Sequence, residues 1–236
     1  MAASVPDLVV RTSGAEYIGE PFPEPGARVR LRPDGGPPWL VVEFGVEGVL
    51  VPSWPIRLWE VTEVEPAPEA EQISTRATRA VAFTVVRELD AWRVFGPQGQ
   101  SVAWLLDCLA LLTRDDVLAL ADALRGEPAE SNERLTDRRF RRPGRSYIGL
   151  DGPSQTALEL AHQAVLRAAR DRDPSALAFD PVDGVDVLAN PDWTNAAQAV
   201  ARAVIGFVEA PADAALLILA WKSRFGDPPA VARGDE

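Results

Sequence analysis

ARVRLRPDGGPPWLVVEFGVEGVLVPSWPIRLWEVTEV, residues 27–64, is the stretch that decides the fold of the first part of this chain. Apolar residues alternate with arginine over 27–32, which is the two-residue period of a strand, and PDGG at 33–36 predicts a turn. Apolar segments at 39–44, 49–51 and 56–64 predict three further strands, and 8–11 predicts a fifth. Short strands separated by glycine and proline indicate a small β-meander or SH3-like barrel over residues 1–65.

The sequence EPAPEA at 65–70 ends this β region, because two prolines and acidic residues interrupt the strand pattern. We therefore expect a linker at 66–71. Beyond it, apolar residues recur at spacings of four and three, as they do along one helix face: Ile73, Ala77, Val81, Val85, Leu89 and Trp92. These spacings predict a helix over 73–92, and the β-branched run at 84–86 leaves a hairpin as the alternative.

Helical periodicity continues through most of the remaining chain. Apolar positions predict helices over 102–112, 114–124, 154–170, 193–208 and 211–225, with Thr113 as an N-cap. Polar segments marked by glycine and proline predict irregular structure at 126–153 and 171–192, and 227–236 is expected to be a frayed tail. The predicted class is therefore α+β, with the small β domain followed by a mainly α-helical domain at 72–226.

Two segments of the helical part are rich in alanine, LELAHQAVLRAARDRD (158–173) and AAQAVARAVIGFVEAPADA (196–214), and the segment LAWKSRFGDP (219–228) closes this part. In this respect the chain resembles a broad class of uncharacterised alanine-rich helical proteins from actinobacteria. The resemblance covers roughly 70–125 and 154–228 and is one of composition, without a shared motif. It implies a helical fold, no established activity and no site residues.

Composition narrows the class of protein. The chain has 236 residues, a formal net charge of −11, one cysteine and one histidine. These counts exclude an intramolecular disulfide and a four-ligand Cys/His zinc site. Residues 1–10 lack the basic start and apolar run of a signal peptide, and no apolar stretch reaches the roughly 18 residues of a membrane span. We expect a cytoplasmic protein with no membrane segment and no cofactor.

The sequence positions of the single cysteine and the single histidine indicate that these side chains pack against apolar neighbours. Cys108 shares an apolar helix face with Leu105 and Leu112, and a buried thiol behaves as a small hydrophobe. His162 lies in an apolar helix, and Glu159-x-x-His162 is one copy of a motif that di-iron bundles need twice. We expect structural roles for Cys108 and His162 and predict no metal site from them.

Other loop motifs lack part of the pattern that their chemistry requires. GPQG at 96–99 precedes a helix, but a P-loop needs Gly-Lys, and the only lysine is Lys222. GRSYIG at 144–149 misses the G-x-S-x-G nucleophile elbow by one residue. Asp180, Asp183 and Asp186 could attract calcium, but their spacing is not that of an EF-hand loop. A solvated loop is expected there, with another type of cation site as the alternative.

The most specific feature is a basic cluster in an acidic chain. Residues 131–145 contain six arginines and two acidic residues, whereas the rest of the chain has a net charge of −15. The candidate binding residues of this cluster are Arg138, Arg139, Phe140, Arg141, Arg142 and Arg145. Arginine binds carboxylates and phosphates in bidentate geometry. Because the surrounding charge repels nucleic acid, we expect the cluster to bind acidic protein surface, its own or that of a partner.

Two hypotheses of function remain. The first is a non-enzymatic interaction or assembly protein whose partners are other proteins or a second copy. The second is a hydrolase or transferase that uses carboxylates and arginines without His or Cys, for example Asp183 or Asp186 with arginines of 138–145. A cleft with several carboxylates of shifted pKa would favour the enzyme, and a large exposed apolar or aromatic patch would favour the interaction protein.

Overall fold

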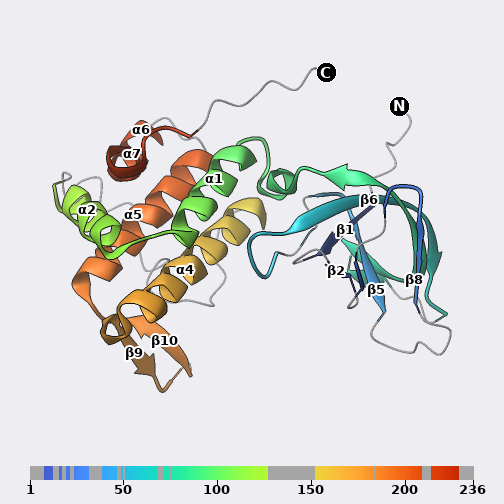
Figure 1. Cartoon of the computed structure of the whole chain (residues 1–236), viewed down its shortest axis with the longest axis horizontal. Coiled ribbons are helices and arrows are strands. Elements are labelled where there is room, and N and C mark those ends of the chain that lie inside the picture. The colour runs from blue at the N-terminus through green and yellow to red at the C-terminus, as the bar shows by residue number, and fades with distance from the viewer. Residues whose placement is uncertain are drawn as a thin grey trace. The chain divides into compact units, whose positions relative to one another are not determined.

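The computed structural model shows a β-rich part followed by a helical part (Figure 1). It describes residues 8–12, 16–17, 20–21, 24–31, 39–46, 49, 51–68, 72–74, 76–126, 152–182, 184–208 and 214–228. The chain divides into two compact units, Met1–Val94 and Phe95–Glu236, which are described separately. The first contains a small four-stranded antiparallel barrel and the second is mainly helical, so the predicted α+β class is confirmed.

The barrel consists of strands β1 (Leu8–Thr12), β5 (Leu40–Phe44), β6 (Arg57–Pro66) and β8 (Ala77–Leu89). All pairs are antiparallel, and they close in the order β8–β5–β1–β6–β8. Strands β4 (Arg28–Arg30) and β7 (Gln72–Ser74) also pair with β8, and β2 (Glu16–Tyr17) pairs with β3 (Glu20–Pro21). Within the closed barrel, however, the consecutive strands β5 and β6 do not pair with each other, because β1 and β8 lie between them.

Strand β8 closes the barrel because it uses both of its edges. One edge pairs with β5 over 77–80 and with β4 over 82–84, and the other pairs with β6 over 80–89. Shifts of register interrupt the β6–β8 pair, and Glu63, at φ +47°, lies in the shift between Thr62 and Glu65. Such bulges bend a strand and increase its twist. The 13 residues of β8 thus reach around the small barrel.

Alternating apolar side chains fill the barrel. The buried cluster comprises Val10, Leu40, Val42, Trp59, Val61, Ala80, Phe83 and Val85. Full burial of a valine- or leucine-sized side chain contributes about 1.5–3 kcal/mol. This apolar cluster explains how so small a unit holds its strands together.

The helix predicted over 73–92 is wrong, because 77–89 is strand β8. Ala77, Val81, Val85 and Leu89 are four residues apart, and four is an even number as well as nearly one helical turn. That spacing therefore places side chains on one face of a strand as readily as on one face of a helix. The β-branched residues at 84–86 favour the strand, and the alternative hairpin agrees with the β7–β8 pair. A 3-10 helix, η2 (Ala91–Phe95), follows.

Two further sequence expectations concern the β region. The predicted strand at 49–51 is not formed at Val49 or Val51. The expected linker at 66–71 falls inside the first compact unit, since Pro66 ends β6 and Ala67 is buried. The compact units divide between Val94 and Phe95, so 72–94 belongs with the barrel.

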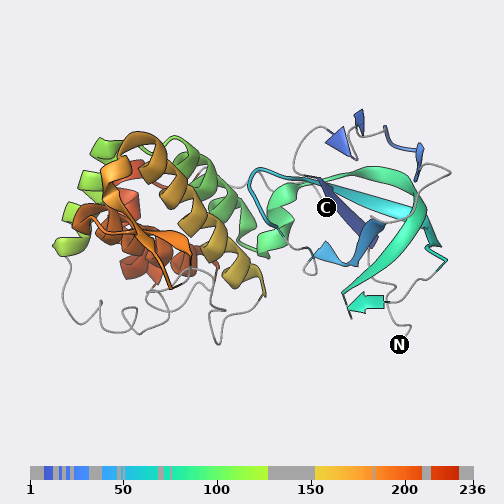
Figure 2. The same cartoon turned by 90° about the horizontal axis from the view of Figure 1, so that it is seen from below.

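The second unit is organised around helix α5 (Pro191–Val208). It contacts α1 (Gly99–Ala110), α2 (Arg114–Arg125), α4 (Gly152–Arg172), α6 (Ala214–Leu217) and α7 (Leu219–Phe225). Figure 2 shows α4 running alongside α1, in agreement with their contacts. The predicted helices at 102–112, 114–124, 154–170 and 193–208 are confirmed, and the one at 211–225 is described from 214 as two short helices.

Close packing at α5 requires a glycine. A Cβ added at Gly206 would lie 2.6 Å from Ile218 Cγ2 and 3.2 Å from Leu217 Cβ. Real Cβ atoms do not approach other carbons to 2.6 Å, so any side chain at 206 would push α6 away from α5. Gly206 therefore lets these two segments approach closely.

The irregular structure predicted for 171–192 is wrong in its middle. After η4 (Pro174–Ala176) the chain forms an antiparallel hairpin of β9 (Leu177–Asp180) and β10 (Val185–Leu188). The two strands have four residues each, with proline and glycine in the turn between them. Strands this short cannot be distinguished from a loop by their sequence pattern. The other irregular segment, 126–153, lies outside the described residues except at its ends.

The role of β8 leads to a test with fragments. Fragment 1–94 contains the whole barrel, and we expect β-type far-UV circular dichroism and cooperative thermal unfolding from it. Fragment 1–70 lacks the strand that pairs with β4, β5 and β6, so it should be unfolded. Cooperative unfolding of 1–70 would show that β8 is dispensable. Fragment 95–236 should give a helical spectrum.

Candidate functional site

The side chains predicted as site residues are not gathered in one place. The arginine cluster, Arg138 to Arg145 with Phe140, lies outside the described residues, as does Asp183. Cys108 lies on α1, His162 on α4, Asp180 on β9 and Asp186 on β10. Each of these described residues has its own surroundings.

Cys108 and His162 have the surroundings of packed side chains. Cys108 is half-buried, less than its sequence position predicts. Burial raises the pKa of its thiol, and the negative charges of Asp107 and Asp116 raise it further. Burial lowers the pKa of His162, whose Nε2 is buried and makes no hydrogen bond to any described residue. A raised thiol pKa reduces the reactive thiolate, so this pair lacks the activation that nucleophilic catalysis needs.

The acidic hairpin does not bring its aspartates together. Asp180 is paired in register with Val185, so Asp180 and Asp186 point to opposite faces of the hairpin. Asp186 Oδ2 accepts a hydrogen bond from Arg170 Nη2 at 2.8 Å. Among the described residues, no group of three or more His, Cys, Asp or Glu side chains could hold a metal ion.

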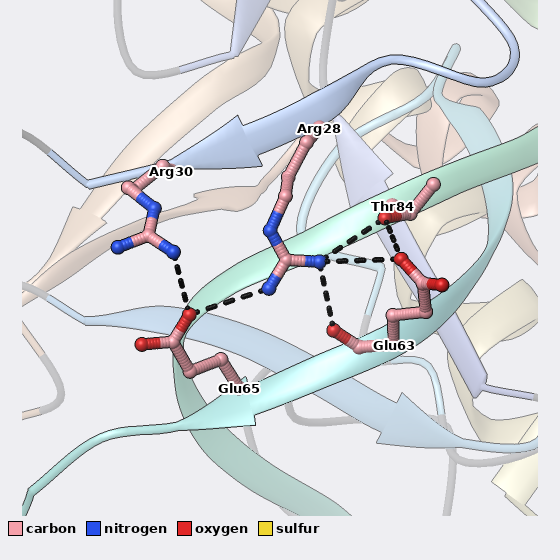
Figure 3. Close-up of polar contacts among 5 residues, drawn as sticks. All are labelled: Arg28, Arg30, Glu63, Glu65 and Thr84. Carbon is pink, nitrogen blue, oxygen red and sulfur yellow. Dashed lines mark hydrogen bonds and ion pairs between the residues drawn. The ribbon is translucent and has the colours of Figure 1, made fainter.

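The largest described charge network lies on the outside of the barrel (Figure 3). Arg28 reaches from β4 across Thr84 of β8 to β6, where it bonds the Glu63 carbonyl at 3.2 Å and Glu65 Oε2 at 3.3 Å. Arg30 Nη2 donates to the same Glu65 oxygen at 2.8 Å. Thr84 Oγ1 accepts from Arg28 at 3.2 Å and donates to Glu63 Oε2 at 2.7 Å. The network ties the short strand β4 to the barrel.

Further along the β6–β8 pair, oppositely charged side chains again pair across the two strands. Arg57 binds Glu88 through two bonds of 2.8 and 2.7 Å, and Arg87 Nε donates to Glu60 at 2.6 Å. The hydrogen bond from Arg57 lowers the pKa of Glu88. Exposed ion pairs contribute only ~0–1 kcal/mol each. Glu88 is in register with Trp59 and Arg87 with Glu60, so the two pairs lie on opposite faces of the β6–β8 pair, and on each face the charges are satisfied internally.

Glu43 on β5 is the described carboxyl with the most unusual surroundings. Only 5% of the residue is exposed, and it lies opposite Val9 of β1 and Ala77 of β8, both buried. Burial raises its pKa to about 7, against the lowering effect of the Arg11 charge. Arg11 Nε lies 3.8 Å from Glu43 Oε1, too far for a hydrogen bond, and Glu43 Oε2 has no hydrogen-bond partner among the described residues. Glu43 is therefore a weakly compensated buried acid.

In the helical unit, the main polar cluster joins α2 to α7. Thr113 Oγ1 accepts from the Asp116 amide at 3.2 Å, and Asp116 Oδ2 accepts from the Thr113 amide at 2.7 Å, which completes a capping box. Arg224 Nε of α7 donates to Asp116 Oδ1 at 2.6 Å. Burial acts to raise the pKa of Asp116, but the Thr113 hydrogen bonds and Arg224 outweigh it and hold the pKa low.

These observations do not assemble a catalytic centre. The described carboxyls with shifted pKa values are Glu43, Glu88, Asp116 and Asp173, which lie on different elements and owe their shifts to different local causes. An enzyme of the second hypothesis would need such groups to converge on one cleft. The residues that the hypothesis named, Asp183 and the arginines, lie outside the described part, and Asp186 pairs with Arg170.

Sequence reasoning missed both Glu43 and the Arg28 network. The network had a visible signal, since arginines at 28 and 30 and glutamates at 63 and 65 occupy alternate strand positions. Glu43 had none, because its burial depends on which strands lie beside β5.

No family model, curated protein or solved structure matches this chain. The resemblance to actinobacterial helical proteins therefore stays a prediction, and no helix within the described ranges is long and apolar enough to cross a membrane.

Glu43 should make the stability of the barrel depend on pH. A carboxyl whose folded-state pKa is raised stabilises the fold below its unfolded pKa, near 4.5, and loses that effect as pH rises to about 7. The free energy of unfolding should therefore fall between pH 4.5 and 7.5, by on the order of 3 kcal/mol. Urea unfolding of Glu43→Gln should show a flatter pH profile and a more stable protein at pH 8. The exposed Glu24→Gln serves as control and should keep the wild-type profile; an unchanged profile in Glu43→Gln would contradict this assignment.

The capping box generates a second test. Thr113→Ala removes the side-chain acceptor at the start of α2 and should lower the free energy of unfolding by about 0.5–2 kcal/mol. Thr113→Ser keeps the hydroxyl and is the matched control. Equal stability of the two variants in urea unfolding would show that the box makes no net contribution.

Proposed function

We propose that this protein acts by binding other proteins, as an interaction or assembly protein, and catalyses no reaction itself. The observation that carries the proposal is the exposure of large apolar side chains on the helical unit. Leu111, Phe179, Val182, Leu216 and Leu219 are each more than half exposed. Exposed apolar and aromatic side chains are the anchors that protein partners bury, and leaving several in water is unfavourable.

The arginine cluster is the second element of the proposal. Arg138, Arg139, Arg141, Arg142 and Arg145, with Phe140, are proposed to bind acidic protein surface. Outside 131–145, the region 95–236 has 9 basic and 19 acidic residues, so carboxylates surround the cluster at high effective concentration. The same excess of negative charge opposes binding to nucleic acid. The partner is therefore a protein, either another chain or an acidic surface of this one.

Replacing Arg138, Arg139, Arg141 and Arg142 by Ser tests this proposal. The variant should have a lower melting temperature, or lose a self-association visible in sedimentation velocity, and the effect should be larger at low salt because salt screens charge pairs. A control variant, with Arg93, Arg114, Arg167 and Arg172 replaced by Ser, removes as many positive charges elsewhere in the helical and linker regions. It should change neither property to the same extent.

Two outcomes would contradict the proposal. One is an equal response of the cluster variant and the control variant, which would reduce the effect to net charge. The other is micromolar binding of DNA or RNA at ~150 mM salt that the cluster variant loses.

A further inference from the structure

The outer edge of strand β9 is available for pairing. The Ala176 carbonyl accepts from the Ala189 amide and the Asp180 carbonyl from the Gly184 amide, both at 2.8 Å, so these carbonyls face β10. Alternate residues of a strand direct their peptide groups to opposite edges. Leu177 and Phe179 therefore direct theirs away from β10. The Leu177 N–H already donates to the Pro174 carbonyl, so the groups open to a partner are the Leu177 carbonyl and the N–H and carbonyl of Phe179. Within the described ranges, β9 pairs with β10 alone (Figure 1).

The side chains beside this edge differ between the two faces of the hairpin. Phe179 is 65% exposed and Val182, in the turn, is 86% exposed. Asp186 lies opposite Phe179 on the same face, and its charge is paired with Arg170. The Phe179 face therefore combines an exposed aromatic ring with a carboxylate that already has a partner. On the other face, Asp180 accepts one hydrogen bond, from the Val182 amide at 2.9 Å, and forms no ion pair with any described residue. One face thus offers an aromatic ring and the other a carboxylate.

We infer that the outer edge of β9 takes an added strand from a partner protein, and that this strand alternates apolar and basic residues. Its backbone would bond the Leu177 carbonyl and the N–H and carbonyl of Phe179, as in strand addition to an exposed sheet edge. Successive side chains of the added strand fall on opposite faces, so an apolar residue lies beside Phe179 and a basic residue beside Asp180. This surface is separate from the arginine cluster, and the inference rests on the proposed function, two of whose exposed apolar residues are Phe179 and Val182.

Charge and stability both favour this occupant. Residues 177–188 contain three aspartates and no basic residue, so pairing of β9 with the β9 of a second copy would join two negative hairpins. A basic partner strand has the opposite sign. The hairpin has only two strands, with β10 packed against α4 and α5, so a third strand on the outer edge of β9 would add backbone hydrogen bonds to it.

The test measures binding of a labelled peptide of alternating valine and arginine to the full chain by fluorescence anisotropy. A peptide of the same composition, with its valines and arginines in separate blocks, is the control. We expect saturable binding of the alternating peptide and much weaker binding of the block peptide. Phe179→Ser should weaken binding at least about tenfold, and Asp180→Asn should weaken it mainly at low salt.

Backbone pairing is tested separately. Phe179→Pro and Phe179→Ser both lack the ring, but Phe179→Pro also lacks an outward N–H, and edge strands tolerate proline there. Phe179→Pro should therefore fold and bind the peptide more weakly than Phe179→Ser. Leu118→Ser, which removes an exposed apolar side chain from α2, should bind the peptide like the wild type. Equal binding of the block peptide, or undiminished binding by Phe179→Ser, would overturn the inference. So would a dimer of the wild-type chain that Phe179→Ser dissociates, because the occupant would then be a second copy.

Discussion

The pairing of β8 on both of its edges is the interaction on which the N-terminal unit depends. Through one strand of 13 residues, β5 and β6 are joined into a closed barrel, and β4 and β7 are attached to it. The polar features of the unit follow from this strand. Thr84 of β8 lies at the centre of the Arg28 network, and Ala77 of β8 covers one side of Glu43. In the helical unit, α5 is the element that the other helices contact, and Gly206 allows its neighbours to approach it closely.

Elements whose sequence signal lies within a few neighbouring residues could be predicted, and elements that depend on distant strands could not. Helix α2 was predictable because Thr113, Asp115 and Asp116 carry the information for their own N-terminus. Strand β8 was not, because a spacing of four residues between Ala77, Val81, Val85 and Leu89 fits both a strand and a helix. The presence of β5 and β6 on either side of β8 decides between strand and helix. No short segment of the sequence contains that information. The β9–β10 hairpin was missed because each strand has only four residues.

The same distinction applies to the candidate sites. That Cys108 and His162 are packing residues could be expected from their apolar neighbours, and the directions of their pKa shifts agree with partial burial. The exposed edge of β9 could not be predicted before the hairpin itself was known. Nor could Glu43 be distinguished from the other glutamates of the barrel, since Glu60, Glu63 and Glu65 find arginine partners across the strands at hydrogen-bond distance and Glu43 does not.

The raised pKa of Glu43 also determines how many protons the chain binds when it folds. Between pH 4.5 and about 7 the unfolded chain carries an ionised carboxylate at this position, whereas the barrel holds the neutral acid. Folding in that range therefore takes up as much as about one proton from the solvent. In a calorimeter that proton comes from the buffer, so the apparent enthalpy of unfolding includes the heat of buffer ionisation and differs between phosphate and an amine buffer at the same pH.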